Sequence, residues 1–195
     1  MTLENICVYC GSNSGRLPAY AEAAVAFGQT LAERGIGLVY GGSSVGIMGT
    51  LADAVLAQGG RVIGIIPDAL VKKEVAHRNL TEQYIVDSMH ERKRMMADKS
   101  SAFVALPGGA GTMEELFEVW TWAQLGLHTK PCGLLNVAGY YDKLEAFLDH
   151  TVSEAFMRPE HRAMLMIERD ADALLERFAV YQAPVVSKWI RPGKE

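Results

Sequence analysis

Short apolar runs rich in β-branched residues alternate along the chain with longer segments whose apolar positions recur every three to four residues. Runs of about four to eight such residues are typical of buried strands, and the longer period is typical of helices that cover a sheet. We expect strands at residues 6–9, 36–40, 62–66, 102–106 and 132–137, and a further short strand at 81–86. We expect helices at 18–34, 46–58, 88–99, 112–125, 141–154 and 172–180. The alternation predicts an α/β fold in which a parallel sheet carries helices on both faces.

The length and composition are those of one ordinary globular domain. The chain has 195 residues, of which 49% are hydrophobic and 22% charged, enough for a single core around one sheet. We assign residues 1–182 to this domain. Residues 183–195, which include two prolines, are expected to form a C-terminal extension.

Charge and cysteine content limit the expected binding partners and the cellular compartment. The net charge of −4 gives no broad field for nucleic acid, and no stretch approaches the roughly 20 apolar residues of a membrane span. The first residues lack the basic and apolar regions of a secretory signal. Three cysteines, at positions 7, 10 and 132, form an odd set that is expected to stay reduced. We therefore expect a cytoplasmic protein that binds neither nucleic acid nor membrane.

Glycine-rich turns follow three of the expected strands, at residues 11–15, 41–49 and 107–112. Because the carboxyl ends of parallel strands meet at one edge of a sheet, these turns converge on one crevice, as in Rossmann-like doubly wound folds. No turn matches the G-x-G-x-x-G fingerprint, and none carries the lysine of a P-loop. Nicotinamide dehydrogenases and ATPases are therefore disfavoured.

The third turn has the sequence P-G-G-A-G-T and opens a helix. Gly108, Gly109 and Gly111 lack Cβ atoms, so their backbone N–H groups can approach an anion. The helix adds its N-terminal donors and the positive end of its dipole. A phosphate is the expected ligand. We expect the Thr112 hydroxyl and, from the other two turns, Ser12 and Gly42 to complete the phosphate and ribose contacts.

Glu115 lies near the start of the same helix, where a carboxylate would repel a phosphate. One interpretation is that it faces another part of the ligand. The alternative is a capping box, in which Thr112 is the N-cap and Glu115 folds back onto the Thr112 N–H.

The helix expected at 88–99 runs opposite to the strands, so its N-terminal turns lie at the same edge as the glycine turns. Met89, Arg92, Lys93 and Met96 share one of its faces, because they are three and four residues apart. Arg92 suits a phosphate or ribose oxygen, and Met89 and Lys93 are candidates for contact with a flat base. The alternative is a solvated basic stripe above packed methionines.

These two segments together, M-H-E-R-K at 89–93 and P-G-G-A-G-T-M-E-E at 107–115, resemble the LOG family of cytokinin riboside 5′-monophosphate phosphoribohydrolases. The resemblance extends to V-Y-C-G-S at 8–12, to Y-G-G at 40–42 with V-G-I-M-G at 45–49, and to T-W-A-Q-L-G at 121–126. The chain departs from the family at Ser43, where many relatives have glycine, and at Ala110, where an aromatic is common.

The resemblance implies hydrolysis of the N-glycosidic bond of an adenosine-type 5′-monophosphate, plain or N6-modified, to a free base and ribose 5-phosphate. It places Arg92 and Glu115 at the catalytic positions and implies a homodimer. The physical chemistry agrees, because a fixed carboxylate stabilises the positive charge that develops on the ribose. The chain shows no paired metal-ligand spacing, and we expect neither a metal nor a cofactor.

Two rival functions remain open. A carrier of nucleotides or phosphate ligands would use the same cradle without chemistry, and a ribosyltransferase would use Glu115 as a covalent nucleophile. A lysine decarboxylase, a label given to some relatives, would need a cofactor lysine, and nothing around Lys93 or Lys99 marks one.

Two further segments carry expectations. The helix expected at 112–125 is apolar around most of its circumference, so one side should face a dimer partner. The connection at 67–82, with Lys72, Lys73, His77 and Arg78, is either a lid or a basic surface loop.

Overall fold

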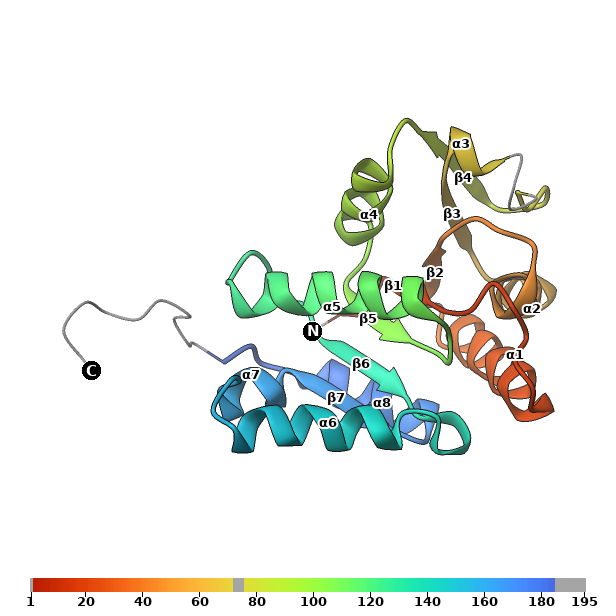
Figure 1. Cartoon of the computed structure of the whole chain (residues 1–195). Helices are drawn as coiled ribbons and strands as arrows, with labels where there is room; N and C mark the ends of the chain where they lie inside the picture. The colour runs from red at the N-terminus through yellow and green to blue at the C-terminus, as the bar shows by residue number, and fades with distance from the viewer. Residues whose placement is uncertain (1, 72–75, 185–195) are drawn as a thin grey trace.

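The computed structural model describes residues 2–71 and 76–184 of the chain. They contain one parallel sheet of seven strands in the order β4-β3-β2-β1-β5-β6-β7 (Figure 1). The strands are β1 (Asn5–Tyr9), β2 (Gly37–Tyr40), β3 (Val62–Pro67), β4 (Glu82–Val86), β5 (Ala102–Ala105), β6 (Cys132–Leu135) and β7 (Leu165–Glu168). The doubly wound α/β architecture expected from the alternating pattern is confirmed.

Helices cover both faces of this sheet. They are α1 (Pro18–Glu33), α2 (Gly46–Ala57), α3 (Asp68–Val71), α4 (Met89–Asp98), α5 (Ala110–Gln124), α6 (Asp142–Ser153), α7 (Pro159–Ala163) and α8 (Ala171–Ala179), with a 3₁₀ turn at Val137–Gly139. Alternate strand residues point to opposite faces. Ile6 and Val8 therefore pack with α1, α2 and α8, whereas Cys7 and Tyr9 pack with α4, α5 and α6.

The order of the strands creates the crevice. The chain builds outward from β1 to β4, then returns through α4 to place β5 on the other side of β1. The connections that leave β1 and β5 therefore diverge, and the space outside their carboxyl ends stays open, as it does at the switch point of other doubly wound sheets. α4 and α5 lie on the same face of the sheet, before and after β5 (Figure 1).

The pattern-based elements agree with the structure except near the end of the chain and at short pieces. The strand candidate at 81–86 is confirmed as β4, but β7, α7 and α3 were not expected. These elements span only four or five residues each, too few for a hydrophobic period to show. The proposed C-terminal extension at 183–195 lies, apart from its first two residues, outside the described part of the chain.

The described residues contain no helix long and apolar enough to cross a membrane. The same residues contain no group of three or more histidine, cysteine or acidic side chains arranged to hold a metal ion.

Candidate active site

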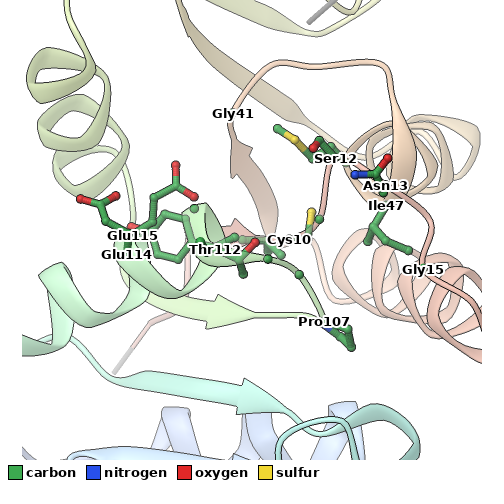
Figure 2. Close-up of a pocket in the computed structure, with 18 of the residues that line it drawn as sticks. Cys10, Ser12, Asn13, Gly15, Gly41, Ile47, Pro107, Thr112, Glu114 and Glu115 are labelled. Carbon is green, nitrogen blue, oxygen red and sulfur yellow. The ribbon is translucent and has the colours of Figure 1, made fainter. Parts of the chain in front are cut away.

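A cavity of about 510 Å³ lies at the carboxyl ends of β1, β2 and β5. Its walls come from the turns after these strands and from the first turns of α4 and α5 (Figure 2). The lining residues are 8–15, Tyr20, Gly41, Ile47, Met48, Leu70, Met89, Arg92, Met96, 107–112, Glu114, Glu115 and Tyr140. The glycine turns at 11–15 and 107–112 therefore do converge, as the strand pattern predicts.

In the third turn, close packing requires glycine at position 108 but not at positions 109 and 111. A Cβ at Gly108 would lie 2.1 Å from Oγ1 of Thr112 and 2.8 Å from the backbone nitrogen of Gly11. A Cβ at Gly109 or Gly111 would meet nothing within 4 Å. Gly108 is thus required by contact between two loops. Gly109 and Gly111 keep the cavity wall bare, so a ligand can reach the backbone there.

Helix α5 begins at Ala110, with Gly109 as its N-cap and no side-chain cap. The capping-box alternative is therefore wrong, because Thr112 is already inside the helix. Thr112 is buried, and its hydroxyl lies against Gly108. The first three residues of α5, 110–112, line the cavity. The N–H groups in the first turn of a helix have no partner within the helix.

Helix α4 begins as the sequence predicts. The Ser88 hydroxyl accepts a hydrogen bond from the Glu91 N–H at 3.1 Å, which makes Ser88 the N-cap. The Glu91 carboxylate accepts a hydrogen bond from the Asp87 N–H at 2.9 Å. These caps fix the first turns of α4 and therefore the backbone position from which the Arg92 side chain extends.

Arg92 and Glu115 meet on the cavity wall. Nη1 of Arg92 lies 3.9 Å from Oε1 of Glu115, and the two side chains are only 7% and 13% exposed. The other contacts of the guanidinium are long: Nη2 donates to the Gly41 carbonyl at 3.4 Å, and Nη1 lies 3.7 Å from the Met89 sulfur. Its Nε has no hydrogen-bond partner among the described residues. A buried cation with such weak contacts retains donors for an anionic ligand.

Gly41 makes room for this guanidinium. A Cβ at position 41 would lie 1.9 Å from Nη2 of Arg92 and 2.6 Å from Cε of Met48. The glycine after β2 is therefore needed for the position of Arg92. Gly42, which we expected at the ligand, does not line the cavity. Its φ of +75° and its close approach to β3 give it a role in the turn itself.

Lys93 does not line the cavity, although it is as buried as Arg92. Its Nζ lies 2.6 Å from Oε1 of Glu114 and 3.0 Å from Oε2 of Glu118, so it links α4 to α5. Burial alone would lower the pKa of Lys93, but the hydrogen bonds that its ammonium donates to the two carboxylates outweigh this effect and raise the pKa. The expected contact of Lys93 with a base is thus not supported by its position, whereas Met89 does line the cavity.

The remaining expected residues fall in two groups. Ser12 and Ala110 line the cavity. Ser43 is fully buried and pairs with Ala76 in an isolated antiparallel bridge, so its departure from the family pattern lies in the packing behind the site. Figure 2 shows Ser12 across the cavity from Glu115.

The connection at 67–82 is anchored at its second half. His77 is buried, its N–H donates to the Gly42 carbonyl at 2.9 Å, and its ring nitrogen Nε2 lies 2.9 Å from the Asp53 carboxylate. Leu70, from the first half, lines the cavity. Lys72 and Lys73 lie outside the described residues.

Some cavity residues were not predicted from the sequence as site residues, among them Cys10, Tyr20, Leu70 and Tyr140. Tyr140 follows the strand β6, and its position at the carboxyl edge of the sheet is the one signal that could have found it. The three cysteines are buried free thiols. Burial raises the pKa of the Cys10 thiol, so this cavity residue stays protonated.

The chain is similar in sequence to proteins of one known family. Residues 48–178 match the family model described as "Possible lysine decarboxylase". The probable cytokinin riboside 5′-monophosphate phosphoribohydrolase LOGL9 of Oryza sativa subsp. japonica is 52% identical over 176 residues, 90% of this chain and 78% of that protein. The cytokinin riboside 5′-monophosphate phosphoribohydrolase LOG7 of Arabidopsis thaliana is 49% identical over 179 residues, 92% of this chain and 82% of that protein.

Among solved structures, the molybdenum cofactor binding protein of Rippkaea orientalis is similar, with a TM-score of 0.67 and 21% sequence identity. The similarity covers 90% of this chain and 95% of that one. At this identity it shows a shared fold and nothing about the ligand.

The link between α4 and α5 through Lys93 gives a testable prediction. Lys93→Met should lower the free energy of unfolding by about 1–3 kcal/mol, because Glu114 and Glu118 would keep their charges without a shared cation. Urea unfolding followed by circular dichroism measures the change. The matched control is Arg94→Met on the same helix, whose exposed pair with Asp98 should be worth less than about 0.5 kcal/mol. Equal losses in the two variants would contradict the proposed link.

Proposed function

Because the chain belongs to the LOG family of cytokinin riboside 5′-monophosphate phosphoribohydrolases, we propose that its cavity hydrolyses the N-glycosidic bond of an adenosine-type 5′-monophosphate. The products are the free base, with or without an N6 substituent, and ribose 5-phosphate. The observation that carries the proposal is the buried pair of Arg92 and Glu115, which faces the cavity at 3.9 Å. The volume of about 510 Å³ lies within the range of small-molecule sites.

The phosphate binds at the glycine turn. Gly109 and Gly111 leave the backbone open to the cavity, and the first turn of α5 contributes N–H donors and the positive end of its dipole. Thr112 and Ser12 also line the cavity and supply hydroxyl groups. Gly108 acts indirectly, because it lets the turn pack against Gly11.

Glu115 acts at the sugar. Cleavage of the C1′–N bond leaves the electron pair on the base and positive charge on the ribose, which a nearby carboxylate stabilises. A water oxygen forms the new bond to C1′. Glu115 accepts a proton from that water, and this proton ends on the base nitrogen, so the step consumes one water and needs no redox partner or metal. The distance between phosphate and C1′ in the substrate keeps the carboxylate away from the phosphate charge.

Arg92 positions the ligand by binding its phosphate or ribose oxygens. Its guanidinium lies between Glu115 and the carbonyl of Gly41, and its Nε has no hydrogen-bond partner in the described part of the chain. A phosphate or ribose oxygen would complete its bonding, and such charge-assisted bonds are the strong ones.

The base lies against soft apolar side chains. The cavity is lined by Met48 of α2, Leu70 of α3, and Met89 and Met96 of α4. Flexible thioethers adapt to a flat ring and to an apolar N6 substituent. We therefore place Met89 at the base and leave Lys93 to its two carboxylates.

The rival functions receive less support. The molybdenum cofactor binding protein is 21% identical and shows the fold alone, whereas relatives at about half identity are named as phosphoribohydrolases. A pyridoxal-type lysine decarboxylase needs a lysine amine in the site. No lysine lines the cavity among the described residues, and Lys99 lies 4.0 Å from the Tyr84 ring centroid. Transfer of the ribosyl group to another base, with Glu115 as nucleophile, would appear as base exchange.

We also propose that two copies of the chain associate and that the protein acts in the cytoplasm. Met113, Phe117 and Trp122 of α5 are partly buried within one chain, while Leu125 and Leu127 beyond it are 40% and 69% exposed. A second copy would cover this apolar end. Three buried thiols fit a reducing compartment.

Glu115→Gln tests the chemistry. Loss of the carboxylate charge should lower kcat for AMP and for isopentenyl-AMP by about 10²- to 10⁴-fold, with KM changed much less. Release of ribose 5-phosphate measures turnover. Glu176→Gln, at an exposed position of α8, is the matched control and should retain full activity. Turnover by Glu115→Gln at the wild-type rate would refute the role of Glu115.

Gly41→Ala tests the position of Arg92. The added Cβ must displace the guanidinium, since its ideal position is 1.9 Å from Nη2, and a shift of about 1 Å can cost 10²-fold in rate. The melting temperature should change little, because the atoms that must move are the ends of flexible side chains. In a double-mutant cycle with Arg92→Met, followed by calorimetric AMP affinity, Gly41→Ala should add little further loss. Independent, additive losses would show that Gly41 acts through something else.

The dimer is tested by light scattering at micromolar protein concentration. The chain has a mass of 21.3 kDa, and we expect twice that mass in solution. The mass of a single chain under these conditions would exclude the dimer without affecting the proposed chemistry.

A further inference from the structure

Three consecutive carbonyl groups at the start of the glycine turn, those of residues 106–108, each accept a hydrogen bond from outside the turn. The Tyr141 hydroxyl donates to the Leu106 carbonyl at 2.6 Å, and the Tyr140 hydroxyl donates to the Gly108 carbonyl at 2.6 Å. Between them, the Gly11 N–H donates to the Pro107 carbonyl at 3.1 Å. The donors come from the two neighbouring connections, after β1 and after β6, so the turn is clamped from both sides.

This clamp determines where the amide hydrogens of the turn point. In a trans peptide the C=O and the following N–H point in opposite directions. When the Gly108 carbonyl is bound to Tyr140, the N–H of Gly109 is turned away from that ring. Two adjacent glycines could otherwise rotate this peptide with little steric cost. For the N–H groups of the turn to point toward a phosphate, its carbonyl groups must be held by donors that point away from the phosphate.

The two tyrosines differ in burial. Tyr141 is 1% exposed and belongs to the core, and burial raises its pKa. Tyr140 is 43% exposed and lines the cavity. Its ring packs edge-on against Tyr141 and Tyr20, with centroids 4.9 and 5.6 Å apart. Loss of the Tyr140 hydroxyl should therefore leave the fold intact while it frees the Gly108 carbonyl.

We propose that Tyr140 is a positioning residue that orients the Gly108–Gly109 peptide for the 5′-phosphate and so sets the preference for nucleotides over nucleosides. The inference rests on the proposed function, because it assigns a determinant to the same site. Tyr140 acts through the backbone of the turn and takes no part in bond cleavage. Its effect should appear in contacts with the phosphate and be absent from a ligand without one.

Tyr140→Phe tests the proposal, since it removes the hydroxyl and keeps the ring. We expect KM for AMP and the dissociation constant of ribose 5-phosphate to rise about two- to tenfold, the range of one hydrogen bond. The dissociation constant of adenosine, which lacks the phosphate, should stay the same. Tyr84→Phe is the matched control, because it also loses a hydroxyl hydrogen bond, to Glu82, but lies on β4 and does not line the cavity.

Binding and turnover separate this inference from the proposed function. Unchanged affinity of Tyr140→Phe for AMP and ribose 5-phosphate would overturn the inference, as would equal losses on AMP and adenosine. If the wild type binds ribose 5-phosphate in a Tyr140-dependent way but hydrolyses no nucleotide, the proposed function fails and the positioning role stands. Calorimetric titration with ribose 5-phosphate gives the affinity without turnover.

Discussion

The buried guanidinium of Arg92 is the constraint around which the site is arranged. A cation removed from water is costly unless charges and acceptors surround it. The protein supplies the Glu115 carboxylate at 3.9 Å and the Gly41 carbonyl at 3.4 Å, both at long range. Because these contacts of the guanidinium are long, an anionic ligand can supply its remaining hydrogen bonds. The bare glycine at position 41 follows from the same constraint, because any side chain there would occupy the space of the guanidinium.

Positions behind the cavity maintain this arrangement. Lys93 binds Glu114 and Glu118 and so ties α4 to α5, next to the helix positions that carry Arg92 and Glu115. On the other side, hydroxyl and amide donors hold the carbonyls of the glycine turn. One set of contacts fixes the helices, and the other fixes the backbone that meets the phosphate. Preorganised groups of this kind are what a site needs to act on a transition state without rearrangement.

The comparisons illustrate how little a fold says about chemistry. A molybdenum cofactor binding protein at 21% identity shares this fold, whereas sequence relatives at about half identity are named as phosphoribohydrolases. The description of the matching family model mentions lysine decarboxylase, yet among the described residues no lysine lines the cavity. A shared sheet does not fix the side chains at the switch point, and the function has to be argued from them.

The sequence by itself determined six of the seven strands, the converging glycine turns and the family, because period and turn chemistry depend on near neighbours along the chain. It missed β7 and the short helices α3 and α7, which are too brief for a period. Only the tertiary structure decided that Glu115 meets Arg92 instead of capping its helix, that Lys93 turns to Glu114, and that Tyr140 reaches Gly108. These partners lie 21 to 32 residues apart in the chain, and no local pattern specifies which distant side chains a folded sheet brings together.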